Sequence, residues 1–261
     1  MDRFRKKWGL LFKVLIIATG LMILKGGIDY ISFHVIIAKG EWPRAISALV
    51  GAVVFTIAII FSGVLADYKE SEKIPGELAG SIKALYSDCK VIPFSDKQRA
   101  EELRSHIRGL LFTINANFRA NVWEIKEINA AMDAANEDIR RLAETGLAPQ
   151  FVVKLRTELM NIDKISNRIK TVTETTFIPA AYGLAELAVV AILVLLLFIR
   201  VEPYYGGMVI IGATAGATAV LLIGILMLIN DMDNPFEVNK NTYADVDLSL
   251  LWNLEDELKT E

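Results

Sequence analysis

Apolar residues are gathered in four long runs that polar sequence separates. The runs 45–66 and 206–230 carry no charge, and the run 177–199 carries one acid, Glu186. A helix needs about 20 apolar residues to cross the roughly 30 Å hydrocarbon core of a bilayer, so each of these three runs is long enough to span a membrane. The pattern therefore predicts three transmembrane helices in these ranges.

A fourth membrane helix is predicted near the N-terminus, in a less regular run. Residues 8–24 are apolar apart from Lys13. We expect one long or tilted helix that frays near Gly26–Gly27 and leads into an interfacial stretch ending at a turn over 40–43. A basic segment before an apolar core is also typical of a cleaved signal peptide. The sequence shows no small-x-small cleavage site followed by a polar start, which favours a retained helix.

Charged residues at the ends of these runs predict the orientation. Basic residues cluster before the first helix, and short segments rich in lysine and arginine stay in the cytoplasm. Four spans then place both termini in the cytoplasm and leave two short outer loops, at 39–44 and 200–205. We expect a multi-pass protein of the cell (inner) membrane that is surrounded by lipid.

A long polar region with helical patterning lies between the second and third runs. Residues 67–176 carry basic and acidic side chains in balance. A cap signal at Ser95 predicts a helix that continues to Thr145, with a bend near Asn115–Asn121. After Pro149, apolar residues recur every three or four positions, as on one face of a helix. Packing inside a helical bundle explains this stripe, and a coiled coil with a partner is the alternative.

The predicted fold class is therefore an all-α membrane protein. Two plus two transmembrane helices flank a cytoplasmic helical bundle, which is inserted between the second helix and the third. The expected parts are 1–66 for the first helix pair, 67–176 for the cytoplasmic helical domain, 177–230 for the second pair and 231–261 for an acidic cytoplasmic tail.

Composition and charge exclude several functions. Of the 261 residues, 53% are hydrophobic and 23% charged, and the formal net charge is −3. The chain therefore has no basic field of the kind that attracts nucleic acid. One cysteine and two histidines offer neither a disulfide framework nor the spacing of zinc ligands. Without a Ser/His/Asp set or a phosphate-binding glycine loop, we expect neither an enzyme nor a cofactor.

The acid of the third predicted span lies near its middle. A charge at that depth costs roughly 2.5–3.5 kcal/mol on insertion scales, so Glu186 should face protein or a water-filled cavity. It is a functional candidate as an ion contact or a proton carrier. The alternative is a structural hydrogen bond to Thr56, Ser62 or Tyr182.

The fourth span ends abruptly in LINDMDNPFEVNKNTY (228–243). Proline ends the helix because it cannot donate a backbone hydrogen bond, and the phenylalanine after it can anchor the tail on an apolar surface. The two acids stand where the helix dipole disfavours them, so a cation, a basic partner or water has to compensate them. A solvated helix end is one interpretation. A cation or partner site, with both acids as weak candidates for metal ligands, is the other. This exit motif comprises Asp231, Asp233, Asn234, Pro235 and Phe236.

Two stretches resemble bestrophins, a family of ion channels. SGVLADYKESEKIPGELAGSIKALYSDC (62–89) is similar to the stretch where bestrophins leave their second helix, and DMDNPF is similar to their Asp/Asn-Pro-Phe exit. The two-plus-two layout most resembles the prokaryotic bestrophin-like family. The chain lacks the Arg-Thr-Asn and Trp-Trp groups of bestrophins around 64–73, and it lacks the acidic calcium clasp of the animal members. The resemblance therefore does not imply that calcium gates this protein.

The resemblance implies a homo-oligomer, pentameric in bestrophins, in which the second helices surround a path for inorganic ions. Gly51, Phe55 and Ile59 form one row on the second span, and Ser62 belongs to the neighbouring row. We expect these residues to line the path, with an apolar ring that gates by dewetting. The alternative is that they meet lipid or other helices. Selectivity between cations and anions is left open. The alternative function is a non-conducting membrane scaffold or sensor whose cytoplasmic domain binds a partner.

Overall fold

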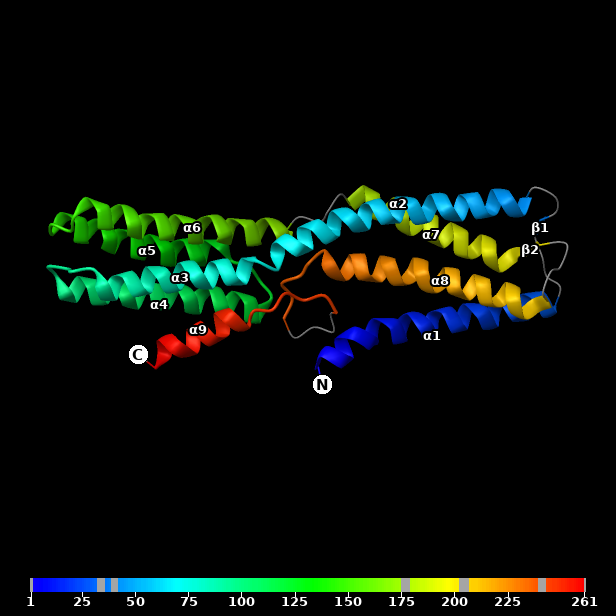
Figure 1. Ribbon diagram of the computed structural model, residues 1–261, viewed down its shortest axis with the longest axis horizontal. Helices are drawn as coiled ribbons and strands as arrows, with labels where there is room; N and C mark the ends of the chain where they lie inside the picture. The colour runs from blue at the N-terminus through cyan, green and yellow to red at the C-terminus, as the bar shows by residue number, and fades with distance from the viewer. Residues whose placement is uncertain are drawn as a thin grey trace. The chain divides into compact units, whose positions relative to one another are not determined.

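The structure is a computed structural model, and it describes residues 2–31, 36–38, 42–174, 179–201, 207–238 and 243–260. The chain forms two compact units (Figure 1). We call the first the membrane unit; it comprises Met1–Asp67, Phe177–Asp233 and Thr242–Ala244. We call the second the polar bundle; it comprises Tyr68–Thr176, Asn234–Asn241 and Asp245–Glu261.

Four helices are long and apolar enough to cross a membrane, as the sequence predicts. They are α1 (Asp2–Tyr30), α2 (Trp42–Ser71), α7 (Pro179–Phe198) and α8 (Gly207–Met232). The last turn of α2 extends beyond the membrane unit into the polar bundle. The prediction of an all-α membrane protein with four spanning helices is confirmed.

The first helix is longer than predicted. α1 continues without a break through Gly26–Gly27 to Tyr30, so the fraying expected there is wrong. Two glycines cost helix stability, but an ion pair within the helix and hydrogen bonds from Lys25 to the carbonyls of Leu197 and Ile199 offset this cost. Lys25 and Asp29 lie one turn apart, both are buried, and their side chains form an ion pair of 2.9 Å.

Two short strands join the far ends of the first and third spans. β1 (Ile36–Ala38) pairs in parallel with β2 (Ile199–Val201), with Ile36 opposite Ile199. The predicted interfacial stretch therefore contains a strand that is tied to the end of α7. Most residues of the predicted outer loops, and much of the predicted turn over 40–43, lie outside the described residues.

In the membrane unit, α8 packs against both α1 and α7. Met22 of α1 lies against Gly216 of α8, and Val14 lies against Gly224. The contact moves toward the start of α1 as it moves toward the end of α8, so the two helices run antiparallel. A Cβ atom on Gly216 would stand 2.3 Å from the Met22 sulfur, so the glycine permits the close approach of the two helices. Small residues commonly allow such packing between membrane helices.

The polar bundle consists of four long helices and a shorter one. They are α3 (Ile74–Val91), α4 (Lys97–Ala120), α5 (Ile125–Glu144), α6 (Pro149–Glu174) and α9 (Ser249–Lys259). α3 and α5 each pack on both α4 and α6, which makes a four-helix bundle, and α9 lies on α3 and α4. The stripe predicted on α6 faces the core through Leu155, Leu159, Ile162 and Ile169, so its interpretation as bundle packing is confirmed.

The helix predicted from Ser95 to Thr145 is two helices, and the prediction of one bent helix is wrong. The chain reverses at Asn121, which adopts a left-handed φ of 53°, so α4 and α5 are antiparallel neighbours (Figure 1). Asparagine tolerates this conformation better than most residues do. The cap of α4 is Asp96 and not Ser95, since the Asp96 carboxylate accepts a hydrogen bond from the Arg99 N–H at 3.0 Å.

Continuity between the polar bundle and the third span is also predicted by the sequence. α6 ends at Glu174 and α7 begins at Pro179, and the residues between them lie outside the described part of the chain.

Candidate functional site

The residues predicted to line an ion path share one side of α2. They are Gly51, Phe55, Ile59 and Ser62, all exposed. Phe55 has 68% of its surface exposed and Ile59 has 59%. The opposite side of α2 is buried at Ile57, Ile60 and Val64. α2 therefore packs on its own chain through one face and presents the other, largely apolar, face to whatever surrounds the chain.

Glu186 is exposed on α7, beside the exposed side chains of Leu187 and Val190. Within the described residues, no hydrogen bond or ion pair joins its carboxylate to another group. Among the described residues, the expected contact with protein is therefore not made. The hydrogen bonds considered as an alternative are not formed either, since Thr56 donates to the Ala52 carbonyl and Tyr182 donates to Asp233.

The two acids of the exit motif are held by hydrogen-bond donors of the membrane unit. Asp231 accepts hydrogen bonds from the backbone N–H groups of Tyr243 and Ala244, at 2.7 and 2.6 Å. Asp233 accepts one from the Tyr182 hydroxyl at 2.9 Å. Backbone and hydroxyl donors thus compensate the carboxylates at a helix end where the dipole disfavours them. Among the described residues, no group of three acid, histidine or cysteine side chains could hold a metal ion.

The rest of the exit motif enters the core of the polar bundle. Phe236 is 4% exposed, and its ring lies 5.9 Å from that of Phe118, centroid to centroid. The Pro235 carbonyl accepts a hydrogen bond from the Val246 N–H at 2.8 Å, and the Asn234 amide donates to Glu237 at 3.3 Å. The motif therefore anchors the chain where it leaves α8.

Lys25 is a buried charge whose importance sequence reasoning missed. It is 2% exposed, and its ammonium donates hydrogen bonds to the carbonyls of Leu197 and Ile199 at 3.2 and 2.6 Å, in addition to pairing with Asp29. An ammonium has three protons, and here all three have acceptors. Two of the acceptors lie where α7 ends, Leu197 in its last turn and Ile199 directly after it, and the dipole of a helix favours a cation there. The spacing of Lys25 and Asp29 by one turn is the only signal in the sequence.

Tyr243 is a second residue that sequence reasoning missed. The Lys13 ammonium lies 5.0 Å above its ring centroid, within the range of a cation–π contact. The same ring lies against Gly9, where a Cβ atom would stand 2.7 Å from it. With its N–H on Asp231, Tyr243 connects the start of α1 to the end of α8.

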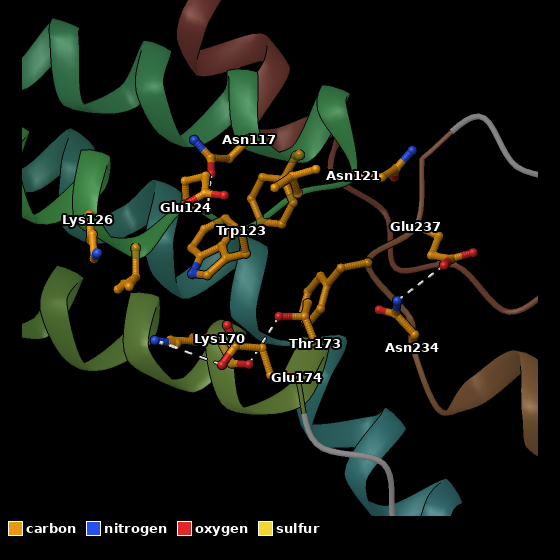
Figure 2. A pocket seen from close by; sticks show the side chains of 14 residues that line it. Asn117, Asn121, Trp123, Glu124, Lys126, Lys170, Thr173, Glu174, Asn234 and Glu237 are labelled. Atoms are coloured by element: carbon orange, nitrogen blue, oxygen red, sulfur yellow. Dashed lines mark hydrogen bonds and ion pairs between the residues drawn. The ribbon is translucent and has the colours of Figure 1, made fainter.

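A cavity of about 370 Å³ lies in the polar bundle beside the exit motif (Figure 2). Trp123 stands at its centre in the view and donates its indole N–H to the Ser166 carbonyl at 3.0 Å. Lysine and glutamate side chains surround the opening: Lys126, Lys170, Glu124, Glu174 and Glu237. The charges are of both signs, so the cavity as a whole favours neither an anion nor a cation.

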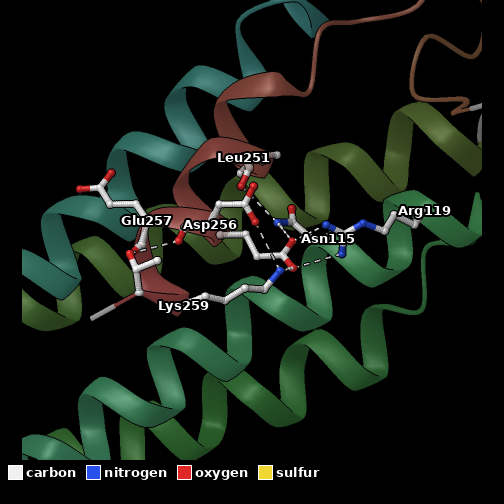
Figure 3. A network of polar contacts seen from close by, with 8 residues as sticks. Asn115, Arg119, Leu251, Asp256, Glu257 and Lys259 are labelled. Carbon is white, nitrogen blue, oxygen red and sulfur yellow. Dashed lines mark hydrogen bonds and ion pairs between the residues drawn. The ribbon is translucent and has the colours of Figure 1, made fainter.

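An ionic network around one buried carboxylate fastens α9 to α4 (Figure 3). Glu255 is 4% exposed and accepts hydrogen bonds from the Asn115 amide at 2.6 Å and from Arg119 at 2.5 Å, and it pairs with Lys259 at 2.7 Å. The Arg119 guanidinium also lies 4.6 Å from the Trp252 ring centroid. A carboxylate with this many donors is well compensated in spite of its burial.

We expect acid to weaken this network. Burial raises the pKa of Glu255, but the bonds from Arg119, Lys259 and Asn115 outweigh burial and hold the pKa at about 2, below the usual 4.5. Because the pKa is lower in the folded chain, the stabilisation is complete above about pH 4.5 and is lost as the pH falls toward about 2. Thermal unfolding of the purified protein from about pH 6 to pH 2, compared with Glu255→Gln, measures this effect.

The comparison with Glu255→Gln also controls for the titration of other acids. Glu137 also has a pKa of about 2, because the hydrogen bond from Arg140, with help from Arg141, outweighs the opposing effect of desolvation; Glu137 is present in both proteins, so its titration cancels. At neutral pH we expect Glu255→Gln to cost about 1.5–3 kcal/mol, the range for hydrogen bonds to charged groups. Equal losses of stability in acid for the two proteins would contradict the assignment.

No protein-family model matches the chain, and no curated protein matches its sequence. Solved structures do match. The bacterial bestrophin homologue from Klebsiella pneumoniae, solved by Zn-SAD phasing, has a TM-score of 0.72 at 13% identity, and the match covers 96% of both chains. A variant of that homologue has a TM-score of 0.71 at 14% identity with 97% of both chains covered. A third structure, described as a membrane protein, has a TM-score of 0.71 at 14% identity with 96% of both chains covered.

These matches extend over both units, including the membrane helices and the inserted bundle. At 13–14% identity they concern the fold, and they agree with the resemblance seen at the exit motif and after the second span. The chain therefore has the fold of the bacterial bestrophin homologues.

Proposed function

We propose that the protein is an ion channel, built from several copies of the chain around a shared axis and with α2 lining the pore. A pentamer is favoured because the resemblance to bestrophins implies one. The permeant species are inorganic ions. The protein resides in the cell (inner) membrane, with both termini and the polar bundle in the cytoplasm.

The exposed face of α2 is the observation that carries the proposal. A membrane helix that packs on its own chain through one side leaves its other side for lipid or for further copies. This side of α2 holds Gly51, Phe55, Ile59 and Ser62. A ring of α2 helices from several copies makes a pore with an apolar constriction at Phe55 and Ile59. Such a constriction gates by dewetting, so the size of its side chains controls the flow of ions.

Alanine at both constriction positions tests the pore. We expect Phe55→Ala with Ile59→Ala to raise ion flux by about tenfold, because smaller apolar side chains widen the constriction and lower the barrier by about 1.4 kcal/mol. The measurement is flux through proteoliposomes or current across planar bilayers.

Leu221→Ala is the matched control, since Leu221 on α8 is 60% exposed and is not assigned to the pore. Unchanged flux in the Phe55 and Ile59 variants would remove the assignment of α2 as the pore lining.

Native mass spectrometry should be done before the flux measurements, because it gives the number of subunits. A monomer rules out a central pore built from one helix per chain. An oligomer that stays silent under every voltage and ion tested supports the non-conducting scaffold or sensor instead.

A further inference from the structure

Two membrane helices each carry an exposed charge for which the described residues offer no ionic partner. Lys13 on α1 is exposed, and no carboxylate of a described residue pairs with it; its ammonium contacts only the Tyr243 ring, at 5.0 Å. Glu186 on α7 is exposed and has no partner among the described residues either. The two charges are of opposite sign.

Both charges lie on apolar surfaces. Phe12 and Ile16, beside Lys13, are 69% and 63% exposed, and Leu187 and Val190, beside Glu186, are 67% and 56% exposed. A lysine reaches toward water along its stem, but the shorter glutamate is poorly suited to do so. An ionisable group on such a surface is expected to pair or to face water.

Glu186 lies nearer to one end of the membrane unit than the middle position that the sequence predicts, and we call this end the exit end. The hydrogen bond between Tyr182 and Asp233 marks this end, because Asp233 directly follows α8. Glu186 comes one turn after Tyr182 along α7, which is about 6 Å at a rise of 1.5 Å per residue.

The ammonium of Lys13 lies at a similar level. Val14 packs on Gly224 of α8, which places the backbone of Lys13 about 12 Å from the exit end. Side chains on a helix lean toward its N-terminus, and the N-terminus of α1 points to the exit end. The contact with Tyr243, whose N–H is bonded to Asp231, confirms that the ammonium leans this way.

We propose that Lys13 of one copy forms an ion pair with Glu186 of the neighbouring copy. The inference rests on the proposed function, because it requires a homo-oligomer. Copies related by an axis along the membrane normal sit at equal depth, so charges that match in depth within one chain also match between chains. The α1 surface and the α7 surface are different patches, and a contact between different patches is heterologous, which forms a ring when the rotation between neighbouring copies closes.

The occupant of the α7 surface is thus a second copy of this chain. Lipid offers no cation within its hydrocarbon region, whereas a neighbouring copy presents one on an apolar surface that suits the surroundings of Glu186. The ion pair between Lys13 and Glu186 brings together two opposite charges, and it fixes how one copy is positioned against the next.

Cysteine cross-linking tests the pairing directly. In a Cys89→Ala background, we expect Lys13→Cys with Glu186→Cys to give covalent dimers and higher ladders on a denaturing gel after treatment with a bismaleimide cross-linker as long as a lysine–glutamate pair, because the Cα atoms of such a pair lie beyond the reach of a disulfide. The single variants Lys13→Cys and Glu186→Cys are the controls, and we expect neither to form such ladders. A bond within one chain, or no bond in a protein that native mass spectrometry shows to be oligomeric, overturns the pairing and leaves the proposed channel standing. A monomer by mass spectrometry overturns both.

Charge reversal provides a second readout. We expect Lys13→Glu and Glu186→Lys each to lower the oligomer-to-monomer ratio by about tenfold or more, and the double exchange to restore most of it. Lys126→Glu and Glu127→Lys are matched controls, since both residues are exposed on α5 of the polar bundle, and we expect no effect from them. Losses that simply add in the double exchange also overturn the pairing.

Discussion

Phe236→Ala lowers the free energy of unfolding of the polar bundle by about 3–5 kcal/mol, the range for removing a buried phenylalanine. The ring is 4% exposed and belongs to the core of the bundle, beside Phe118. Its loss leaves a cavity that well-packed neighbours fill only in part. The measurement is thermal unfolding in detergent, where we expect the midpoint to fall by an amount of the order of 10 °C.

The control for this prediction is Phe112→Ala, because Phe112 on α4 is only half-buried. We expect the control to cost far less than Phe236→Ala. A second readout is limited proteolysis of the segment after α8, which should become faster when its anchor is removed. If the two variants have equal stability, the exit motif is no more than a helix end and does not anchor the chain.

Lys25→Met is expected to destabilise the membrane unit by about 3–5 kcal/mol, the range for breaking a buried ion pair. Methionine keeps the volume of the side chain but removes three hydrogen-bond donors. The carboxylate of Asp29 and the carbonyls of Leu197 and Ile199 then lose a partner that lies within 2.6–3.2 Å of each of them. Thermal unfolding of the purified protein in detergent measures the loss.

The double variant Lys25→Met with Asp29→Asn separates the ion pair from the two carbonyl contacts. If the buried charge of Asp29 dominates the cost, neutralising it recovers a large part of the lost stability. If the carbonyl contacts dominate, the double variant stays as unstable as Lys25→Met. A single variant as stable as the natural chain would show that Lys25 does not hold α1 to the end of α7.

The predictions from the sequence succeeded where the physical cause is local or periodic. Runs of apolar residues that match the thickness of a bilayer specified the four spanning helices. A period of three to four residues identified the buried face of α6, and Pro235 ended the last membrane helix because proline cannot donate to the preceding turn. These causes act within a few residues of one another, so they are visible without any knowledge of the fold.

Errors arose where a distant segment determines the conformation. The reversal at Asn121 looked like a bend, because asparagines alone do not distinguish a bend from a turn. In the structure, the Asn121 side chain both donates to the Val238 carbonyl and accepts from the Val238 N–H. The helix break at Gly26–Gly27 was wrong for a similar reason, since the Lys25 ammonium reaches the carbonyls of Leu197 and Ile199 only after α1 meets α7.

The features of the candidate site were likewise predictable only where their cause is local in the sequence. The sequence identified Glu186 as an unusual acid and the α2 row as a candidate lining, because charge and helical spacing can be read from the order of residues. It did not indicate that both are exposed in the folded chain, nor that backbone N–H groups of Tyr243 and Ala244 compensate Asp231.

The sequence by itself determined that this protein crosses a membrane four times, that a helical bundle separates the two pairs of spans, and where the last span ends. Hydrophobic burial and backbone geometry act locally, and they require no partner from elsewhere in the chain. Only the tertiary structure decided which charges are paired and which are left exposed. A hydrogen bond or an ion pair needs two groups within about 3 Å, and only packing brings groups from distant segments that close.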